Sequence, residues 1–147
     1  MNSLREMIEL HEGRVPHAYQ DSLGYWTIGV GHLIDRRKGG RLPDKLIDML
    51  LDHDIAEHAA ELYRALPWVL ELDPVRQAVL VDMTFNLGIH GLLGFKNTLA
   101  AVRARRWEDA ANGMMQSKWA EQVGSRALRL ADMMRTGHWP DVFVGPY

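Results

Sequence analysis

The chain has 147 residues, 47% of them hydrophobic, and a formal net charge of −2, which is enough apolar sequence for one folded domain with a real core. It contains no cysteine, so disulfides, a thiolate nucleophile and a cysteine-based zinc site are excluded. No run of 18 apolar residues is present, and Arg5, Glu6 and Glu9 interrupt the N-terminal apolar residues, so we expect neither a membrane span nor a signal peptide.

The first third of the chain predicts one helix followed by a small sheet. Residues 3–12 have helical periodicity, with Ser3 as the N-cap and Gly13 just past the end. The D-S-L-G turn at 21–24 and the run YWTIGVGHLI predict a hairpin or small sheet within residues 14–34. Gly29 and Gly31 inside that run indicate a bend or a close backbone approach. A basic loop with two glycines, DRRKGGR, follows at 35–41.

The rest of the chain predicts helices. Pro43 is expected in the first turn of a long helix that runs to about residue 66 and would join two lobes. Asp73 and Pro74 have the pattern of an N-cap and first helical residue, and that helix is expected to end at Gly88. Further helices are predicted from Asn97 to Arg105, from Trp107 onward, and over Arg126–Thr136 with Ser125 as cap and Gly137 as stop.

These elements predict an α+β, mostly helical protein with two lobes. The small α/β lobe covers 13–42, the linking helix 43–66, and the helical lobe 1–12 together with 67–147. The apolar stripe of the first helix is expected to complete the helical lobe. We expect the core to include several methionines and tryptophans: Met114, Met115, Met133, Met134, Trp107, Trp119 and Trp139.

Two carboxylates and a hydroxyl near the small lobe suggest sugar chemistry. Hydrolysis of a glycosidic bond needs an acid for the leaving oxygen and a second carboxylate on the other side of the bond. Glu12 at the helix end is the candidate acid, Asp21 in the turn is the second carboxylate, and Thr27 offers a hydroxyl to orient water. Each of these residues alone is more often structural, whereas the three in this order favour an active site.

The same residues carry a resemblance to a known family. Eight residues separate Glu12 from Asp21, and five separate Asp21 from Thr27, which lies in the run YWTIGVGHLI. This pattern resembles that of phage-type lysozymes (endolysins) of glycoside hydrolase family 24. Matching blocks continue in order to about Trp139: PVRQAVLVDMTFNLG, GFKNTL, RRWEDAA, SKWAEQ, SRALR and RTGHW. The resemblance implies a lysozyme-like two-lobe fold and a muramidase that cuts β-1,4 bonds between N-acetylmuramic acid and N-acetylglucosamine.

The resemblance also implies roles for particular residues. Glu12 matches the general acid, Asp21 the second catalytic carboxylate and Thr27 the residue that holds the attacking water, as in an inverting enzyme. Arg126 matches an arginine that pairs with the catalytic glutamate. Five further matches are expected to contact the glycan: Gly31, Leu33, Phe85, Asn86 and Thr98. His32 and Asp54 are expected to form a structural ion pair. Asn86 stands where relatives carry glutamine, and the segment from Ile34 to Pro43 is shorter than theirs.

Partners and cofactors follow from the same interpretation. We expect peptidoglycan glycan strands as substrate, no cofactor, no metal, no nucleic acid and a monomer. The histidines do not have zinc-protease spacing around His11 and Glu12. The basic stretch 126–136 would make at most a weak contact with an anionic membrane. The protein would stay in the host cytoplasm until a separate pore, a holin, releases it to the wall. A lytic transglycosylase and an inactive peptidoglycan-binding module remain the alternatives.

Overall fold

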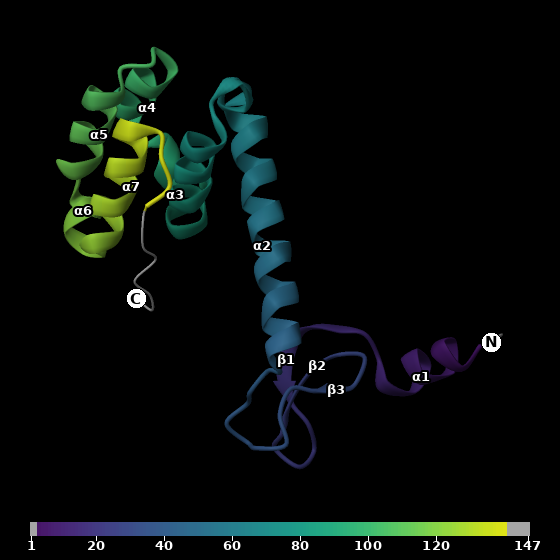
Figure 1. Ribbon diagram of the computed structural model, residues 1–147. Helices are drawn as coiled ribbons and strands as arrows, with labels where there is room; N and C mark the ends of the chain where they lie inside the picture. The colour runs from purple at the N-terminus through teal and green to yellow at the C-terminus, as the bar shows by residue number, and fades with distance from the viewer. Residues whose placement is uncertain (1–2, 141–147) are drawn as a thin grey trace. The chain divides into compact units, whose positions relative to one another are not determined.

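The computed structural model describes residues 3–140, and its contacts divide the chain into two compact units, Met1–Leu51 and Asp52–Tyr147 (Figure 1). The first unit holds one helix and a small sheet, and the second is helical. The division falls inside helix α2 (Asp44–Ala65), which begins in the first unit and ends in the second. The predicted α+β, mostly helical class is confirmed.

The first unit begins with helix α1 (Leu4–Glu12). Ser3 caps it, because its Oγ accepts a hydrogen bond of 3.2 Å from the backbone N–H of Glu6. At the other end Gly13, with φ of 76°, donates its N–H to the Glu9 carbonyl and ends the helix. Both predicted ends are confirmed, so the last residue of α1 is Glu12.

A three-stranded antiparallel sheet follows, with strands in the order β1 (Val15–Gln20), β2 (Trp26–Gly29) and β3 (His32–Leu33). Gln20 pairs with Trp26 across the tight turn that the D-S-L-G sequence predicted. On the other side of β2, Thr27 pairs with Leu33. A bulge or irregularity interrupts the β1–β2 register between Val15 and Tyr19. The central strand β2 therefore places Thr27 between Tyr19 of β1 and Leu33 of β3.

Helix α1 has an exposed apolar stripe within the first unit. None of its residues is buried, and Leu4 and Leu10 are each 67% exposed. The expectation that this stripe completes the helical lobe, and with it the boundaries at 13–42, 43–66 and 67–147, stays a prediction.

Helix α2 begins one residue later than the position of Pro43 suggested, at Asp44. The Pro43 carbonyl accepts hydrogen bonds from the N–H groups of Leu46 and Ile47, so the proline precedes the first helical residue. The helix runs for 22 residues to Ala65, as its long periodic pattern predicted. Only Leu62, near its C-terminal end, is fully buried.

The described part of the second unit, residues 52–140, contains the end of α2, a short 3-10 helix and five further helices. Asp73 caps helix α3, its carboxylate accepting from the backbone N–H of Arg76 at 3.1 Å, and Pro74 is the first helical residue. The elements after α2 are η1 (Pro67–Glu71), α3 (Pro74–Leu93), α4 (Lys96–Arg103), α5 (Trp107–Met115), α6 (Lys118–Val123) and α7 (Ser125–Thr136).

One hydrophobic core lies inside the second unit. Its fully buried side chains come from α2, η1, α3, α4, α5 and α7: Leu62, Val69, Val79, Leu80, Met83, Leu92, Val102, Met114 and Met134. Phe95 meets the buried Trp119 edge to face, with ring centroids 5.9 Å apart. This core holds the helical unit together, and the expected positions of Met114, Met133, Met134 and Trp119 are confirmed.

Arg76 joins α3 to the end of α7. Its guanidinium donates to the carbonyls of Met134 at 2.7 Å and Arg135 at 3.1 Å, and it lies 3.8 Å from the ring centroid of Trp107. A β-carbon at Gly137 would lie 2.8 Å from this guanidinium, and Gly137 has φ of 73°. The glycine that stops α7 therefore also makes room for the arginine.

Two details of the sequence prediction were wrong, the Ser125 cap and the core positions of Trp139 and Met115. Ser125 is the first residue of α7 and not its cap; Gly124 occupies that position with no side-chain hydrogen bond. The predicted end at Gly88 is confirmed, because Gly88 has a non-helical φ of 74° and the range of α3 joins two helices across the kink at this residue. Trp139 is 54% exposed and Met115 is 39% exposed, so neither belongs to the core.

Within residues 3–140, no single helix has the length and apolar character needed to cross a membrane. Helices α3 and α4 reach the length and apolar composition of a membrane-spanning helix only when they are counted as one segment, and they are bent by 106° at their junction.

Candidate active site

Glu12 lies against the turn between β2 and β3. A β-carbon built at Gly31 would lie 2.8 Å from Glu12 Oε2 and 3.0 Å from its carboxyl carbon, which is closer than any real side chain allows. Gly31 also has φ of 67°, a conformation that favours glycine. The structure therefore brings Glu12 and Gly31 together, and the absent side chain at 31 is what lets the carboxylate lie there.

Asp21 holds the turn between β1 and β2. Its Oδ1 accepts hydrogen bonds of 2.9 Å from the backbone N–H groups of both Leu23 and Tyr25. The backbone closes the same turn, because the N–H of Asp21 donates to the Tyr25 carbonyl at 2.8 Å. Among the described residues no hydrogen bond involves Oδ2, so one carboxylate oxygen is structural and the other is available for chemistry.

Thr27 lies in the middle of the sheet and is only 5% exposed. Its hydroxyl donates a hydrogen bond of 3.3 Å to the Tyr25 carbonyl, which leaves the oxygen lone pairs of Thr27 as acceptors. Leu33, 41% exposed, is its cross-strand partner, and directly opposed residues place their side chains on the same face of a sheet. Thr27 and Leu33 are therefore neighbours.

Tyr25 is the residue that sequence reasoning missed. Its backbone N–H binds Asp21, and its carbonyl accepts from both Asp21 and Thr27. One peptide segment therefore fixes the second carboxylate and the hydroxyl relative to each other. No sequence pattern marks this role, because it uses only the backbone of Tyr25 and depends on the turn geometry.

The predicted glycan-binding residues of the second unit fall into separate places. Phe85 and Arg126 line one pocket of about 340 Å³, together with Asp82, Arg129 and Trp139. Asn86 has a structural partner, since its Oδ1 accepts from the indole N–H of Trp119 at 2.8 Å. Thr98 is buried and lies in a different groove, of about 510 Å³, between α4 and α5.

Arg126 has a carboxylate partner inside the second unit. Its Nε and a terminal guanidinium nitrogen lie 2.9 and 2.8 Å from Asp82 Oδ1. The two side chains are 29% and 40% exposed, so the ion pair is partly shielded from water. Asp82 was not predicted from the sequence, because 44 residues separate it from Arg126.

Two predicted pairings concern residues in different units. His32 belongs to the first unit and Asp54 to the second, and the same holds for Glu12 and Arg126. Both pairings stay predictions. Within residues 3–140 no group of three or more histidine, aspartate and glutamate side chains is arranged to hold a metal ion.

An ion pair between Glu9 and Arg14 spans Glu12 in the sequence. Arg14 donates a hydrogen bond of 2.7 Å to Glu9 Oε1. That hydrogen bond, and next the arginine's charge, lower the pKa of Glu9 below its ordinary value. The pair joins the last turn of α1 to the start of β1, on either side of the segment that carries Glu12.

Comparison with known proteins identifies the family of this chain. The sequence model of the family described as phage lysozyme matches residues 9–133, which include the segment with Glu12, Asp21 and Thr27. The chain is 28% identical to "Probable T4-type lysozyme 1" of Dictyostelium discoideum and 25% identical to "Probable T4-type lysozyme 2" of the same organism. Each match covers 93% of this chain and 96% of the relative.

A third relative is much longer. The chain is 29% identical to the pre-baseplate central spike protein Gp5 of Enterobacteria phage T4 over 92% of this chain but only 28% of that protein. The mostly helical fold with a small antiparallel sheet and the matched region together define a glycoside hydrolase of the lysozyme type. The chain belongs to the phage lysozyme family, and its substrate is peptidoglycan.

Proposed function

We propose that the chain is an endolysin that hydrolyses the β-1,4 bond between N-acetylmuramic acid and N-acetylglucosamine. The observation that carries this proposal is the arrangement in the first unit. The Glu12 carboxylate lies on the Gly31 turn, and Asp21 and Thr27 are both fixed by Tyr25. An acid at the end of α1, a second carboxylate in the β1–β2 turn and a water-binding hydroxyl on β2 are the groups that inverting glycoside hydrolysis requires.

In this mechanism each group has a defined task. Glu12 donates its proton to the leaving glycosidic oxygen, which lets the bond break with its electron pair. Asp21 stabilises the positive charge that develops on the sugar ring. The Thr27 hydroxyl oxygen accepts a hydrogen bond from a water molecule and directs that water at the anomeric carbon. As the new C–O bond forms, the water passes a proton to the Asp21 carboxylate, the general base of an inverting enzyme, and the product is a reducing muramic residue.

The turn geometry supports the role of Asp21. A carboxylate that accepts two backbone N–H bonds through one oxygen is held in a fixed position and orientation. Because those bonds engage Oδ1, Oδ2 is the atom we assign to the chemistry. Phe85, Asn86, Thr98 and Arg126 of the second unit, with Gly31 and Leu33, are proposed to contact the glycan, as the family resemblance implies.

We also propose the biological setting that the resemblance implies. The enzyme accumulates in the host cytoplasm as a monomer, reaches the wall through a separate pore and lyses the host cell. Fractionation of infected or expressing cells before and after a pore is formed would test this. Activity outside the inner membrane without any pore would contradict it.

The catalytic assignment is tested by digesting purified peptidoglycan with the wild-type chain and with Glu12→Gln. Mass spectrometry of the products distinguishes the reactions, because hydrolysis adds one water per bond whereas transglycosylation adds none. Hydrated fragments that disappear with Glu12→Gln are the expected result. Fragments lighter by one water would mean a lytic transglycosylase, and binding to the wall with no fragments would mean an inactive module.

A further inference from the structure

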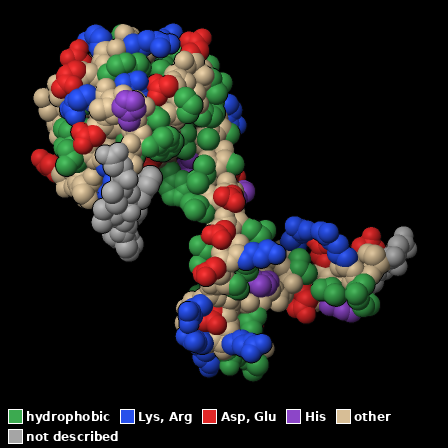
Figure 2. Space-filling view, in the orientation of Figure 1, with side chains coloured by type: hydrophobic (Ala, Val, Ile, Leu, Met, Phe, Trp, Pro, Cys, Tyr) green, Lys and Arg blue, Asp and Glu red, His purple; other side chains and the backbone are tan. Residues whose placement is uncertain are grey.

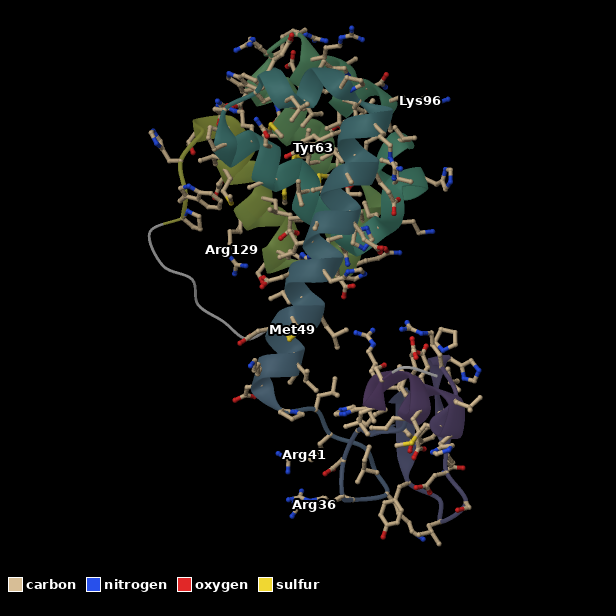
Figure 3. All side chains as sticks on the ribbon, turned by 90° about the vertical axis from the view of Figure 1, so that its right-hand side faces the viewer. Arg36, Arg41, Met49, Tyr63, Lys96 and Arg129 are labelled. Atoms are coloured by element: carbon tan, nitrogen blue, oxygen red, sulfur yellow. The ribbon has the colours of Figure 1, made fainter. Side chains whose placement is uncertain are left out.

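The loop between β3 and α2 presents a cluster of positive charge on the first unit. Arg36, Arg37, Lys38 and Arg41 are all exposed, and Figure 3 shows Arg36 and Arg41 projecting to the same side of the loop. Lys and Arg side chains gather at this end of the unit in the space-filling view (Figure 2). Among residues 3–140, no carboxylate forms an ion pair with any of these four cations.

The one acidic residue in the loop does not neutralise the cluster at its surface. Asp35 is half-buried, and its Oδ2 is out of contact with solvent and has no hydrogen-bond partner among the described residues. Four cations within six residues are therefore exposed, and none of them forms an ion pair with a described carboxylate. A solvated charge run commonly includes acids among its bases, and in this loop the single acid, Asp35, is half-buried.

The loop is supported by packing as well as by its own turn. The Gly40 N–H donates to the Arg37 carbonyl at 3.2 Å, and Gly40 has φ of 76°. A β-carbon at Gly40 would lie 3.4 Å from Trp26 Cδ1, so the loop rests on that indole. Trp26 and Arg41 also line a shallow groove of about 490 Å³ beside the loop. The cations are thus attached to a supported segment next to an aromatic surface.

The loop contacts the turn that carries Asp21. Lys38 Nζ lies 5.8 Å from the centroid of the Tyr25 ring and would lie 3.8 Å from a β-carbon at Gly24. Gly24 and Tyr25 belong to the turn whose N–H groups bind the Asp21 carboxylate. A polymer bound at Asp21 would therefore have its neighbouring groups beside the cationic loop.

We propose that the loop Arg36–Arg41 binds the free carboxylates of the peptide stems that peptidoglycan carries on its muramic residues. This inference rests on the proposed function, because it takes the occupant of the loop to be part of the strand cleaved beside it. The peptide carboxylates are anions, and the guanidinium fork matches a carboxylate in a two-point hydrogen bond. Exposed charges of this kind raise the association rate and the affinity of an oppositely charged polymer.

The test removes two charges without disturbing the Asp21 turn. Arg36→Gln/Arg37→Gln leaves Lys38 in place on Tyr25. The matched control, Arg64→Gln/Lys118→Gln, removes the same charge from exposed positions in the second unit. Affinity for purified sacculi is measured by co-sedimentation in the Glu12→Gln background, and kcat and KM are measured in the active chain. Each measurement uses native sacculi and sacculi whose free carboxylates have been converted to amides.

The loop variant is expected to bind native sacculi about threefold to tenfold more weakly and to raise KM by the same factor, with kcat unchanged. The difference should disappear on amidated sacculi and shrink at high salt, and the control should match the wild type. An equal loss on native and amidated sacculi, or no loss on native sacculi, would overturn the proposal. A loss of affinity seen only with wall polymers that carry phosphate would also overturn it. The absence of any digestion by the wild type would contradict the proposed function instead, since the binding measurement needs no cleavage.

Discussion

Replacing Gly31 by alanine should disable the enzyme more than it destabilises the fold. The new β-carbon would lie 2.8 Å from Glu12 Oε2, 3.0 Å from its carboxyl carbon and 3.1 Å from its Cγ. The whole end of the Glu12 side chain must move away by several tenths of an ångström or more. Because a misplacement of about 1 Å in a catalytic group can lower the rate roughly 10²-fold, we expect kcat/KM of Gly31→Ala to fall by about that factor.

The backbone cost of the same change is modest. Gly31 has φ of 67°, and a non-glycine residue in the left-handed region costs roughly 1–2 kcal/mol. Gly29→Ala is the matched control, because Gly29 has φ of 70° but nothing within 4 Å of its ideal β-carbon. Both variants should lose similar stability in urea unfolding, and only Gly31→Ala should lose most of its activity.

Activity is measured as the initial rate of release of soluble muropeptides from purified sacculi, with both variants well below their unfolding midpoints. If Gly31→Ala retained the activity of Gly29→Ala, Glu12 would not need its position against this turn. The assignment of Glu12 as a catalytic residue held by Gly31 would then be refuted.

Other predictions follow from single contacts. Asp21→Asn keeps an oxygen acceptor for the turn, so it should unfold like the wild type while losing about 10²–10⁴ in rate; Asp21→Ala should lose activity and also about 1–3 kcal/mol of stability. Arg76→Ala should cost about 3 kcal/mol in urea unfolding, because it removes two hydrogen bonds to carbonyls and a ring contact, whereas Arg106→Ala, which breaks an exposed pair, should cost less than about 1 kcal/mol. Arg14→Gln should remove the stabilisation that the ion pair with Glu9 gives the folded state. This stabilisation is fully present above the ordinary Glu9 pKa of 4.5 and is lost as the pH falls through the lower pKa of Glu9 in the folded protein, which thermal unfolding at a series of pH values would show.

Each of these predictions has an outcome that contradicts it. Full activity in Asp21→Asn would mean that the Asp21 charge has no role in the reaction. An Arg76→Ala variant as stable as Arg106→Ala would mean that the end of α7 does not depend on the guanidinium. If the difference in stability between the wild type and Arg14→Gln stayed constant from neutral to strongly acid pH, the ionised form of Glu9 would not be the source of that difference.

The sequence predicted the parts of the fold that depend on local chemistry. Ser3 and Asp73 cap their helices with side-chain oxygens, and Gly13 and Gly137 end them in positive-φ conformations. These signals act within one helical turn, so they can be recognised without the rest of the molecule. Ser125 shows the limit of the approach, because Gly124 with φ of 56° occupies the cap position instead.

The contacts that fix the site were less predictable for a physical reason. Arg76 binds carbonyls 58 and 59 residues away, and Arg126 binds Asp82 at a separation of 44 residues. Such partners are set by how helices pack and not by any local pattern. The candidate acid, second carboxylate and threonine were identified from their order and setting, while the Tyr25 backbone that holds two of them depends on turn geometry alone.

The packing of α7 argues against insertion of residues 126–136 into a membrane interface. Its apolar face is buried in the helical core through Ala127, Leu130, Ala131, Met133 and Met134. A helix that binds in a membrane interface needs that face available. Weak contact with an anionic membrane stays a prediction that Arg129→Glu and vesicle binding would test.

The central claim is that Glu12 protonates the leaving oxygen while water, held by Thr27, attacks the anomeric carbon. The most direct measurement digests peptidoglycan in oxygen-18 water and follows the anomer of the newly formed reducing muramic residue before it equilibrates. The proposed mechanism predicts one labelled oxygen at each new reducing end and the inverted, α anomer first, with both signals absent in Glu12→Gln. A β anomer formed first would indicate a covalent intermediate, and fragments without label would indicate transglycosylation; either result would contradict the assignment.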